Sequence, residues 1–211
     1  MAQNFYLTDN FEVPEFQKRK VIEEIKMTMT AFDCILPDDA GIYCSSEITT
    51  GKRFYELLEK HGVKSKDNLK AKLGDEEFKR VDREFVKENV KRGVAFAEKL
   101  RERGLINVVT PGPYYASDFG QEHYLYLWES FIRKKAYEVR FAYEWEYSNG
   151  CTFEYAVALN KGIPRLDCQG NPLSQADAIE KVSNAINELK AKGFTVEKLE
   201  KYFGYLKPTE P

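Results

Sequence analysis

The sequence predicts an α/β protein in which a parallel sheet of four or five strands is flanked by helices, with an amino-terminal helical extension. Two observations support this prediction. Short segments rich in aromatic and β-branched residues alternate with longer segments whose apolar residues recur at helical spacing. Residues 136–167 also contain a complete unit of strand, loop, helix and strand, whose crossover is normally right-handed. The loop after its first strand is therefore expected at the carboxyl edge of the sheet, where small ligands usually bind.

Six helical segments are expected from apolar residues that recur three and four positions apart. They cover residues 15–32, 53–60, 75–103, 121–134, 151–160 and 174–192. Pro14 stands at the start of the first, Gly104 follows the third, and Ser174 caps the last. Residues 64–74 are expected to contain one or two helical turns, and residues 195–202 a short final helix.

Four strands are expected where aromatic and β-branched residues gather between turn signals. They cover residues 42–44, 105–109, 137–143 and 163–166. A turn at 37–41 precedes the first strand, and Thr-Pro-Gly-Pro at 110–113 ends the second. Residues 1–13 show little pattern and are expected to form an extended arm. Because the strands alternate with helices, the sheet is expected to be parallel and Rossmann-like.

Length and composition limit the organisation of the chain. Its 211 residues, of which 43% are hydrophobic, suit one domain with a normal core. We expect an arm and helix over 1–40, the main domain over 41–170, and carboxyl-terminal helices over 171–211 packed on it. The 32 basic and 34 acidic residues nearly balance, so we expect neither nucleic acid nor a membrane as partner. With no bilayer-spanning apolar run and no signal-peptide pattern, the chain is expected to be soluble and cytoplasmic.

The cysteines and histidines argue against a metal site. Four cysteines occur without a Cys-x-x-Cys pair, and there are only two histidines. No metal or other cofactor is therefore expected. We expect the thiols to be buried and unreactive, because free cysteine packs as a small hydrophobic residue.

Two loops of this sheet edge carry candidate substrate-binding residues. The first strand runs into the polar run 45–51, whose backbone N–H groups suit an anion and which includes Ser45, Ser46 and Gly51. An ordinary polar loop explains the same composition, since no glycine-rich fingerprint is present. The loop 114–120 has the composition of a ligand lid, and its Tyr115 is a candidate for stacking on a base or sugar. Sealing the edge of the core is the alternative for this tyrosine.

Residues 145–156 carry the most specific pattern. The motif Ser-x-Gly-x-x-x-Glu-x-Ala at 148–156, placed after a strand and followed by Gly-Ile-Pro at 162–164, resembles the signature of the nucleoside 2-deoxyribosyltransferase superfamily. Its Trp-Glu-x-Ser-x-Gly form is most similar to a small uncharacterised branch, and its serine resembles that of the nucleoside 5'-monophosphate N-glycosidases. The similarity covers roughly residues 40–167.

The resemblance implies a chemistry. In that superfamily the motif glutamate attacks the anomeric carbon of the sugar and releases the base, which implies Glu154 as the nucleophile. The superfamily's serine contacts the 5'-phosphate, which implies Ser148 and favours a nucleotide over a nucleoside. An acidic residue lies in the helix before the central strand, and Glu129 is its nearest match here. A neighbouring subunit completes the pocket in this superfamily, so at least a dimer is implied.

Residue chemistry agrees with a carboxylate nucleophile at this position. A first-turn glutamate is favoured in its ionised form by the helix dipole, by roughly 0.3–1 kcal/mol. Simple complementation of the dipole is the alternative explanation for Glu154. Cleaving an N-glycosidic bond also requires a proton donor for the leaving base. Because histidine is scarce, we expect a carboxyl of raised pKa, with Asp118 and Glu129 as candidates and a loop cap and a surface charge as their alternatives.

The bend before the motif helix supplies further candidates. Ser148, Asn149 and Gly150 stand where hydroxyl, amide and backbone groups donate to phosphate, and ordinary helix capping is the alternative. Trp145 is a candidate for stacking on the base, although a buried tryptophan is more often plain core.

We therefore expect hydrolysis of the N-glycosidic bond of a nucleoside 5'-monophosphate or related nucleotide, through a glycosyl intermediate on Glu154. Deoxyribosyl transfer to another base is the same chemistry with a different acceptor, and the sequence leaves it open. A non-catalytic nucleotide-binding or sensing module would keep the pocket without releasing base. A structural protein would bind no nucleotide.

Overall fold

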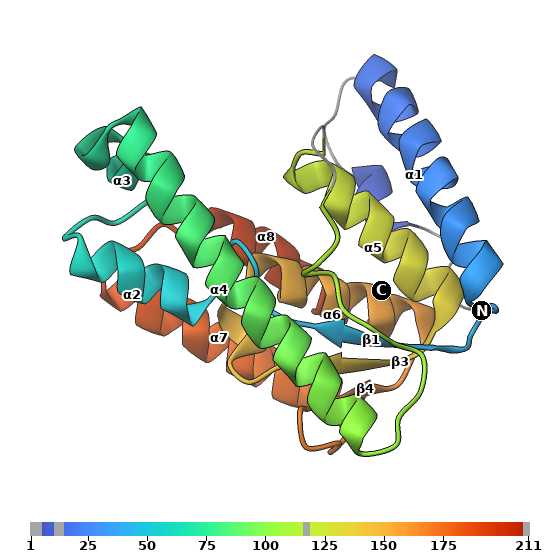
Figure 1. The fold of residues 1–211 in the computed structure, drawn as a ribbon. Helices are drawn as coiled ribbons and strands as arrows, with labels where there is room; N and C mark the ends of the chain where they lie inside the picture. The colour runs from blue at the N-terminus through green and yellow to red at the C-terminus, as the bar shows by residue number, and fades with distance from the viewer. Residues whose placement is uncertain (1–5, 11–14, 116–118, 209–211) are drawn as a thin grey trace.

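The computed structural model describes residues 6–10, 15–115 and 119–208 and has an α/β architecture (Figure 1). Within these residues, four parallel strands form one sheet in the order β2-β1-β3-β4, and helices flank it. The strands are β1 (Gly41–Ser45), β2 (Val108–Val109), β3 (Ala136–Phe141) and β4 (Arg165–Leu166). The predicted fold class is confirmed, with four strands.

The helices follow the predicted segments, with ends shifted by at most three residues for the six main ones. They are α1 (Glu15–Ile35), α2 (Lys52–Lys60), α3 (Lys66–Leu73), α4 (Asp75–Glu102), α5 (Gln121–Lys135), α6 (Asn149–Lys161), α7 (Gln175–Ala191) and α8 (Glu197–Gly204). Two short 3-10 helices, η1 (Leu7–Asn10) and η2 (Trp145–Tyr147), accompany them. The extended arm predicted for 1–13 is therefore wrong at η1.

Two strands begin later than predicted, β2 at Val108 instead of Leu105 and β4 at Arg165 instead of Ile163. Asn107 has φ 55°, a left-handed conformation that a strand does not accommodate, so β2 begins only after it. After β4, the Asp167 carboxylate accepts hydrogen bonds from the backbone N–H groups of Gln169, Gly170 and Asn171. This turn ends β4 at Leu166, the residue at which the strand was predicted to end.

β1 lies inside the sheet and is buried on both faces. Ile42 and Cys44 face α4 and pack with Leu100, while Tyr43 faces α5 and packs against Trp128 at a ring separation of 5.6 Å. The chain leaves β1 towards β2 on one side and later leaves β3 towards β4 on the other. The carboxyl ends of β1 and β3 therefore border the topological switch point, where open α/β sheets bind ligands.

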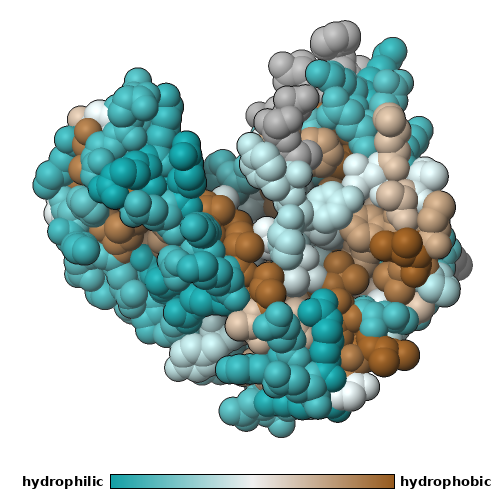
Figure 2. All heavy atoms as spheres, in the orientation of Figure 1, coloured by the Kyte–Doolittle hydropathy of each residue, from teal (hydrophilic) through white to brown (hydrophobic). Residues whose placement is uncertain are grey.

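The helices outside the sheet extend the same core. α1 packs on α5, and α8 packs on α6 through Phe153 and Tyr202 at 5.3 Å. The outward surface of α3 and of the amino-terminal half of α4 is mostly hydrophilic, as the amphipathic pattern of α4 predicts (Figure 2). None of the helices in the described residues has both the length and the apolar composition that crossing a bilayer requires.

A buried lysine joins α1, the link to β1 and the end of α5. Lys135 is 2% exposed, and its Nζ donates to the carbonyl oxygen of Leu36 at 2.8 Å and to Asp38 at 2.7 Å. It also pairs with Asp33 at 2.7 Å. Lys134 pairs with the same Asp33 from the surface, where 44% of its side chain is exposed.

We predict that Lys135→Met lowers the free energy of unfolding by about 1–3 kcal/mol, because it leaves a buried carbonyl without its donor. Lys134→Met is the matched control and should cost less than about 1 kcal/mol, as exposed ion pairs contribute little. Urea denaturation of both variants measures the difference. Equal effects would contradict the anchoring role of Lys135.

Candidate functional site

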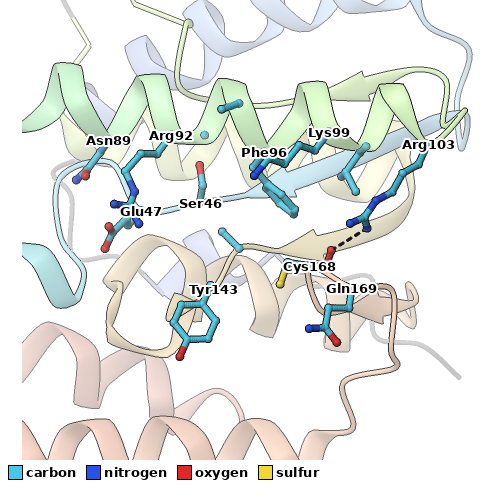
Figure 3. A pocket seen from close by; sticks show the side chains of 14 residues that line it. Ser46, Glu47, Asn89, Arg92, Phe96, Lys99, Arg103, Tyr143, Cys168 and Gln169 are labelled. Carbon is cyan, nitrogen blue, oxygen red and sulfur yellow. Dashed lines mark hydrogen bonds between the residues drawn. The ribbon is translucent and has the colours of Figure 1, made fainter.

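A cavity of about 450 Å³ opens at the carboxyl edge of the sheet (Figure 3). Its walls are the loop after β1, one face of α4, the loop after β3 and the turn after β4. Polar and aromatic side chains on these walls include Ser46, Glu47, Arg92, Lys99, Arg103 and Tyr143. The segments that follow β1, β3 and β4 thus contribute residues to one cavity of a size that suits a small ligand.

The carboxyl of Glu154 lies on the other side of the same strand end. Tyr43 Oη donates to its Oε1 at 2.8 Å, and Ser45 Oγ donates to its Oε2 at 2.5 Å. Tyr43 and Ser45 are two residues apart in β1, so both side chains point to one face of the sheet. Glu154 is 5% exposed, and these two hydroxyls replace the water that a carboxylate would otherwise bind.

Burial and hydrogen bonding act on Glu154 in opposite directions. Burial raises its pKa to about 7, although the hydrogen bonds from Ser45 and Tyr43 lower it. Because α6 begins at Asn149, Glu154 stands in the second helical turn and not in the predicted first turn. The helix dipole fades within one turn, so the two hydroxyls are the main groups that favour the ionised carboxylate. The carboxyl is therefore close to the midpoint of its titration at neutral pH.

The bend before α6 is built by capping. Ser148 is 2% exposed, and its Oγ accepts a hydrogen bond from the backbone N–H of Cys151 at 3.4 Å. The N–H of Asn149 donates to Thr50 Oγ1 at 3.1 Å, which ties the bend to the loop after β1. None of Ser148, Asn149 and Gly150 lines the cavity. The structure thus uses the candidate phosphate ligand Ser148 as a helix cap.

The loop after β1 is held against α4 by close packing. The side chain of Asn89 is buried and donates to the carbonyl oxygen of Ile48 at 3.0 Å. Gly93 leaves room for Ser46, since a Cβ at Gly93 would lie 2.5 Å from Ser46 Oγ. Ser45 and Ser46, both predicted as substrate ligands, therefore separate, with Ser45 bonded to Glu154 and Ser46 on the cavity wall.

Glu47 is a carboxyl on the cavity wall that the sequence did not single out. Burial raises its pKa to about 7, opposed by Arg92 and Arg53 and assisted by Glu144 and Glu56. Its Oε2 is buried without a hydrogen-bond partner among the described residues. In Figure 3 the side chain of Arg92 points from α4 toward the carboxyl of Glu47 at one end of the cavity.

Gly51 is required by the position of Glu47. Gly51 has φ 143°, which side-chain-bearing residues rarely adopt. A Cβ there would also lie 1.9 Å from Glu47 Oε2. Gly51 was predicted to bind substrate, but it does not line the cavity. Its role in the structure is one of backbone geometry, because only glycine lets the Glu47 carboxyl fold back over the loop.

The aromatic candidates do not line the cavity. Trp145 is 4% exposed and stacks on Tyr155 with ring centroids 5.1 Å apart and an interplanar angle of 8°. It therefore belongs to the core, which is the alternative that the sequence left open. Tyr115 is 83% exposed and also lies off the cavity wall. Tyr143 on the cavity wall is an aromatic side chain that the sequence did not select.

One of the two predicted proton donors, Glu129, does not line the cavity. Glu129 is fully buried, and its two carboxylate oxygens accept the backbone N–H groups of Leu7 at 2.7 Å and Thr8 at 2.9 Å. Burial raises its pKa despite these bonds and the nearby Arg133. Glu129, a residue of α5, thus caps η1, and each of its carboxylate oxygens accepts one of these N–H groups. Asp118 lies outside the described residues.

All four cysteines are free. Burial raises the pKa of Cys44 to about 12 and also raises that of Cys151, where the charge of Glu154 adds to the effect. Both are therefore unreactive thiols at neutral pH, as predicted. The prediction of burial is wrong for Cys34, which is exposed.

The sequence does contain signals that point to some of these site residues. Tyr43 and Ser45 stand two apart in a predicted strand, which places them on one face. Glu47 is the only carboxylate in the run 45–51. Arg92 and Lys99 stand seven positions apart on a predicted helix, but so many charges occur on that helix that the spacing alone selects nothing.

Comparison of the chain with protein-family models, with curated proteins and with solved structures gave no match. The proposal of function accordingly rests on the motif and on the geometry of the chain itself.

We predict that Glu129→Gln lowers the free energy of unfolding by about 1–3 kcal/mol, because an amide cannot accept both buried N–H groups of η1. Glu98→Gln, an exposed carboxylate on α4, is the control and should change stability by less than about 0.5 kcal/mol. Chemical denaturation measures both. Unchanged stability of the Glu129 variant would contradict the capping role and return Glu129 to the list of candidate proton donors.

Proposed function

We propose that this chain cleaves the N-glycosidic bond of a nucleoside 5'-monophosphate or related nucleotide, with Glu154 as the nucleophile. The observation that carries the proposal is the buried carboxyl of Glu154, held by the Tyr43 and Ser45 hydroxyls at the switch point of the sheet. A nucleophilic carboxylate has to be fixed in direction and shielded from water. The two hydrogen bonds fix the Glu154 carboxylate, and its burial shields it. The adjacent cavity, with aromatic and cationic walls, supports a nucleotide as the ligand.

The reaction proceeds in two displacements. The Glu154 carboxylate forms a bond to C1' of the sugar while the bond from C1' to the base nitrogen breaks, and the base takes a proton from an acid. Water then attacks C1', the ester bond to Glu154 breaks, and the acid that lost its proton takes one from that water. Each oxygen of Glu154 keeps a lone pair beside its single hydroxyl donor, so the hydrogen bonds do not block attack.

Glu47 is the acid in this scheme. It lies on the cavity wall two residues beyond Ser45, and its Oε2 has no hydrogen-bond partner in the described part of the chain. With its pKa raised to about 7, its carboxyl group retains a substantial protonated fraction at neutral pH. Both Glu47 and Glu154 raise the pKa of Cys151 through their charge, which is consistent with two carboxyls close to one buried thiol.

Removal of the nucleophile tests the proposal. We predict that wild-type protein releases free base from one or more nucleoside 5'-monophosphates and that Glu154→Gln reduces the rate by at least about 10³-fold, because an amide does not form the glycosyl ester. Chromatography of the released base measures the rate. Glu146→Gln in the neighbouring 3-10 helix is the control and should retain activity. Base release that survives in the Glu154 variant would contradict the proposal.

The pH dependence tests the two carboxyl roles. Glu154 must be ionised, so activity should fall as pH drops below about 7, and Glu47 must be protonated, so activity should fall as pH rises above about 7. Glu47→Gln should lower base release by about 10²–10⁴-fold and abolish the high-pH fall while keeping the low-pH one.

A sugar phosphate with a 4-nitrophenolate leaving group supplies the control, because its departure requires no proton. The Glu47→Gln variant should cleave it at nearly the wild-type rate. Glu47 would be ruled out as the acid if the variant kept the fall in activity at high pH, or if its activity on both substrates were reduced equally.

A further inference from the structure

One face of α4 presents cations to the cavity. Arg92, Phe96, Lys99 and Arg103 follow one another at intervals of four, three and four residues, which places them on one side of the helix. Figure 3 shows these side chains extending from α4 over the cavity. Glu47 is the only carboxylate among the described residues of the cavity walls, so these residues carry more positive than negative charge. Such a surface attracts an anion.

Two of these cations lack a hydrogen bond or salt bridge to the part of the chain that the structure describes. These are Arg92 and Lys99, and of the two only Arg92 acts on the Glu47 carboxyl, whose pKa its charge lowers. Arg103 differs, since its Nη1 donates to the carbonyl oxygen of Cys168 at 3.3 Å. By contrast, on the amino-terminal part of the same helix Arg80 pairs with Glu77 and Glu84. Arg92 and Lys99 therefore remain available to a ligand.

A buried hydroxyl on the same wall also lacks a partner. Ser46 is 8% exposed, and its Oγ makes no hydrogen bond with the described residues. It lies against Gly93, one residue after Arg92, because the absence of a Cβ there lets α4 approach the loop. A buried hydroxyl without a partner costs free energy, and a ligand oxygen would satisfy it.

We propose that this cavity binds the phosphate of the nucleotide, with Arg92 and Lys99 pairing with the dianion and Ser46 donating a hydrogen bond to it. The identity of the ligand as a nucleotide rests on the proposed function, whereas the anion site stands on the side chains alone. Ser148, to which the resemblance assigns this contact, is a buried helix cap away from the cavity wall. Arginine suits the role because its planar fork matches two phosphate oxygens at once.

Calorimetric titration of the full chain tests the site. The probes are deoxynucleoside 5'-monophosphates, the matching nucleosides and inorganic phosphate, at pH 7 and low salt. The wild type should bind a nucleotide at least about tenfold more tightly than its nucleoside, and Arg92→Gln and Lys99→Gln should each weaken nucleotide binding about tenfold without changing nucleoside binding. Added salt should weaken only the binding of the phosphate-bearing ligands.

Arg83→Gln and Lys87→Gln are the matched controls, because both residues are exposed on α4 and neither lines the cavity. Both should bind the nucleotide as the wild type does. Equal weakening in the controls, or nucleotide binding unchanged by loss of Arg92 and Lys99, would overturn the proposal. If inorganic phosphate binds to the wild type and binds more weakly to Arg92→Gln, the anion site is supported and the phosphate group alone is sufficient for binding.

The outcomes separate this inference from the proposed function. If phosphate-dependent binding requires Arg92 but the wild type releases no base, the anion site stands and the glycosidase proposal fails. If base release depends on Glu154 but its KM for nucleotides is unchanged in the Arg92 and Lys99 variants, the glycosidase proposal stands and the anion site is wrong.

Discussion

The burial of one carboxyl group at the carboxyl end of β1 constrains the rest of the site. Glu154 is acceptable there only because Tyr43 and Ser45 supply a hydroxyl to each of its oxygens. Those hydroxyls come from alternate residues of β1, and the carboxyl comes from α6, so the strand and the helix have to keep a fixed register. Tyr43 is itself fully buried, and burial together with the charge of Glu154 raises its pKa well above the ordinary value. The tyrosine thus remains a hydrogen-bond donor.

Alternation along β1 also divides the site between two faces. Tyr43 and Ser45 point towards α5 and α6, whereas Cys44 and Ser46 point towards α4. The face of α5 and α6 receives the buried carboxyl, and the face of α4 receives the cavity and its cations. A ligand at the switch point would meet both faces where the strand ends. Burial of the sheet on both sides, a requirement of parallel sheets, thereby puts the proposed nucleophile and the proposed anion site on opposite faces of the same strand end.

The sequence predicted the elements well because helix and strand periodicities are local. It predicted the roles of single residues less well because those depend on distant partners. Glu129 accepts backbone N–H groups from residues more than 120 positions away, and no spacing in the sequence reveals that contact. The position of Glu47 depends on the left-handed region of φ at Gly51 and on burial beneath α4. Trp145 shows the same limit, since stacking on Tyr155 makes it core. The motif residue Glu154 lies in a buried polar network, which agrees with its selection, while its chemistry stays a prediction.

Two carboxyls of similar pKa need different protonation states for the proposed reaction, and their surroundings differ in a way that can separate them. Glu154 accepts two hydroxyl donors, which favour its charged form, and no cation pairs with it among the described residues. One carboxyl oxygen of Glu47 has no hydrogen-bond partner among the described residues, and the positive charge of Arg92 lowers the pKa of Glu47. A phosphate dianion bound to Arg92 would neutralise that positive charge and add a negative charge beside Glu47. Both changes would raise the pKa of Glu47. Ligand binding would then keep the proton on Glu47 and leave Glu154 ionised, the assignment of acid and nucleophile that the reaction requires.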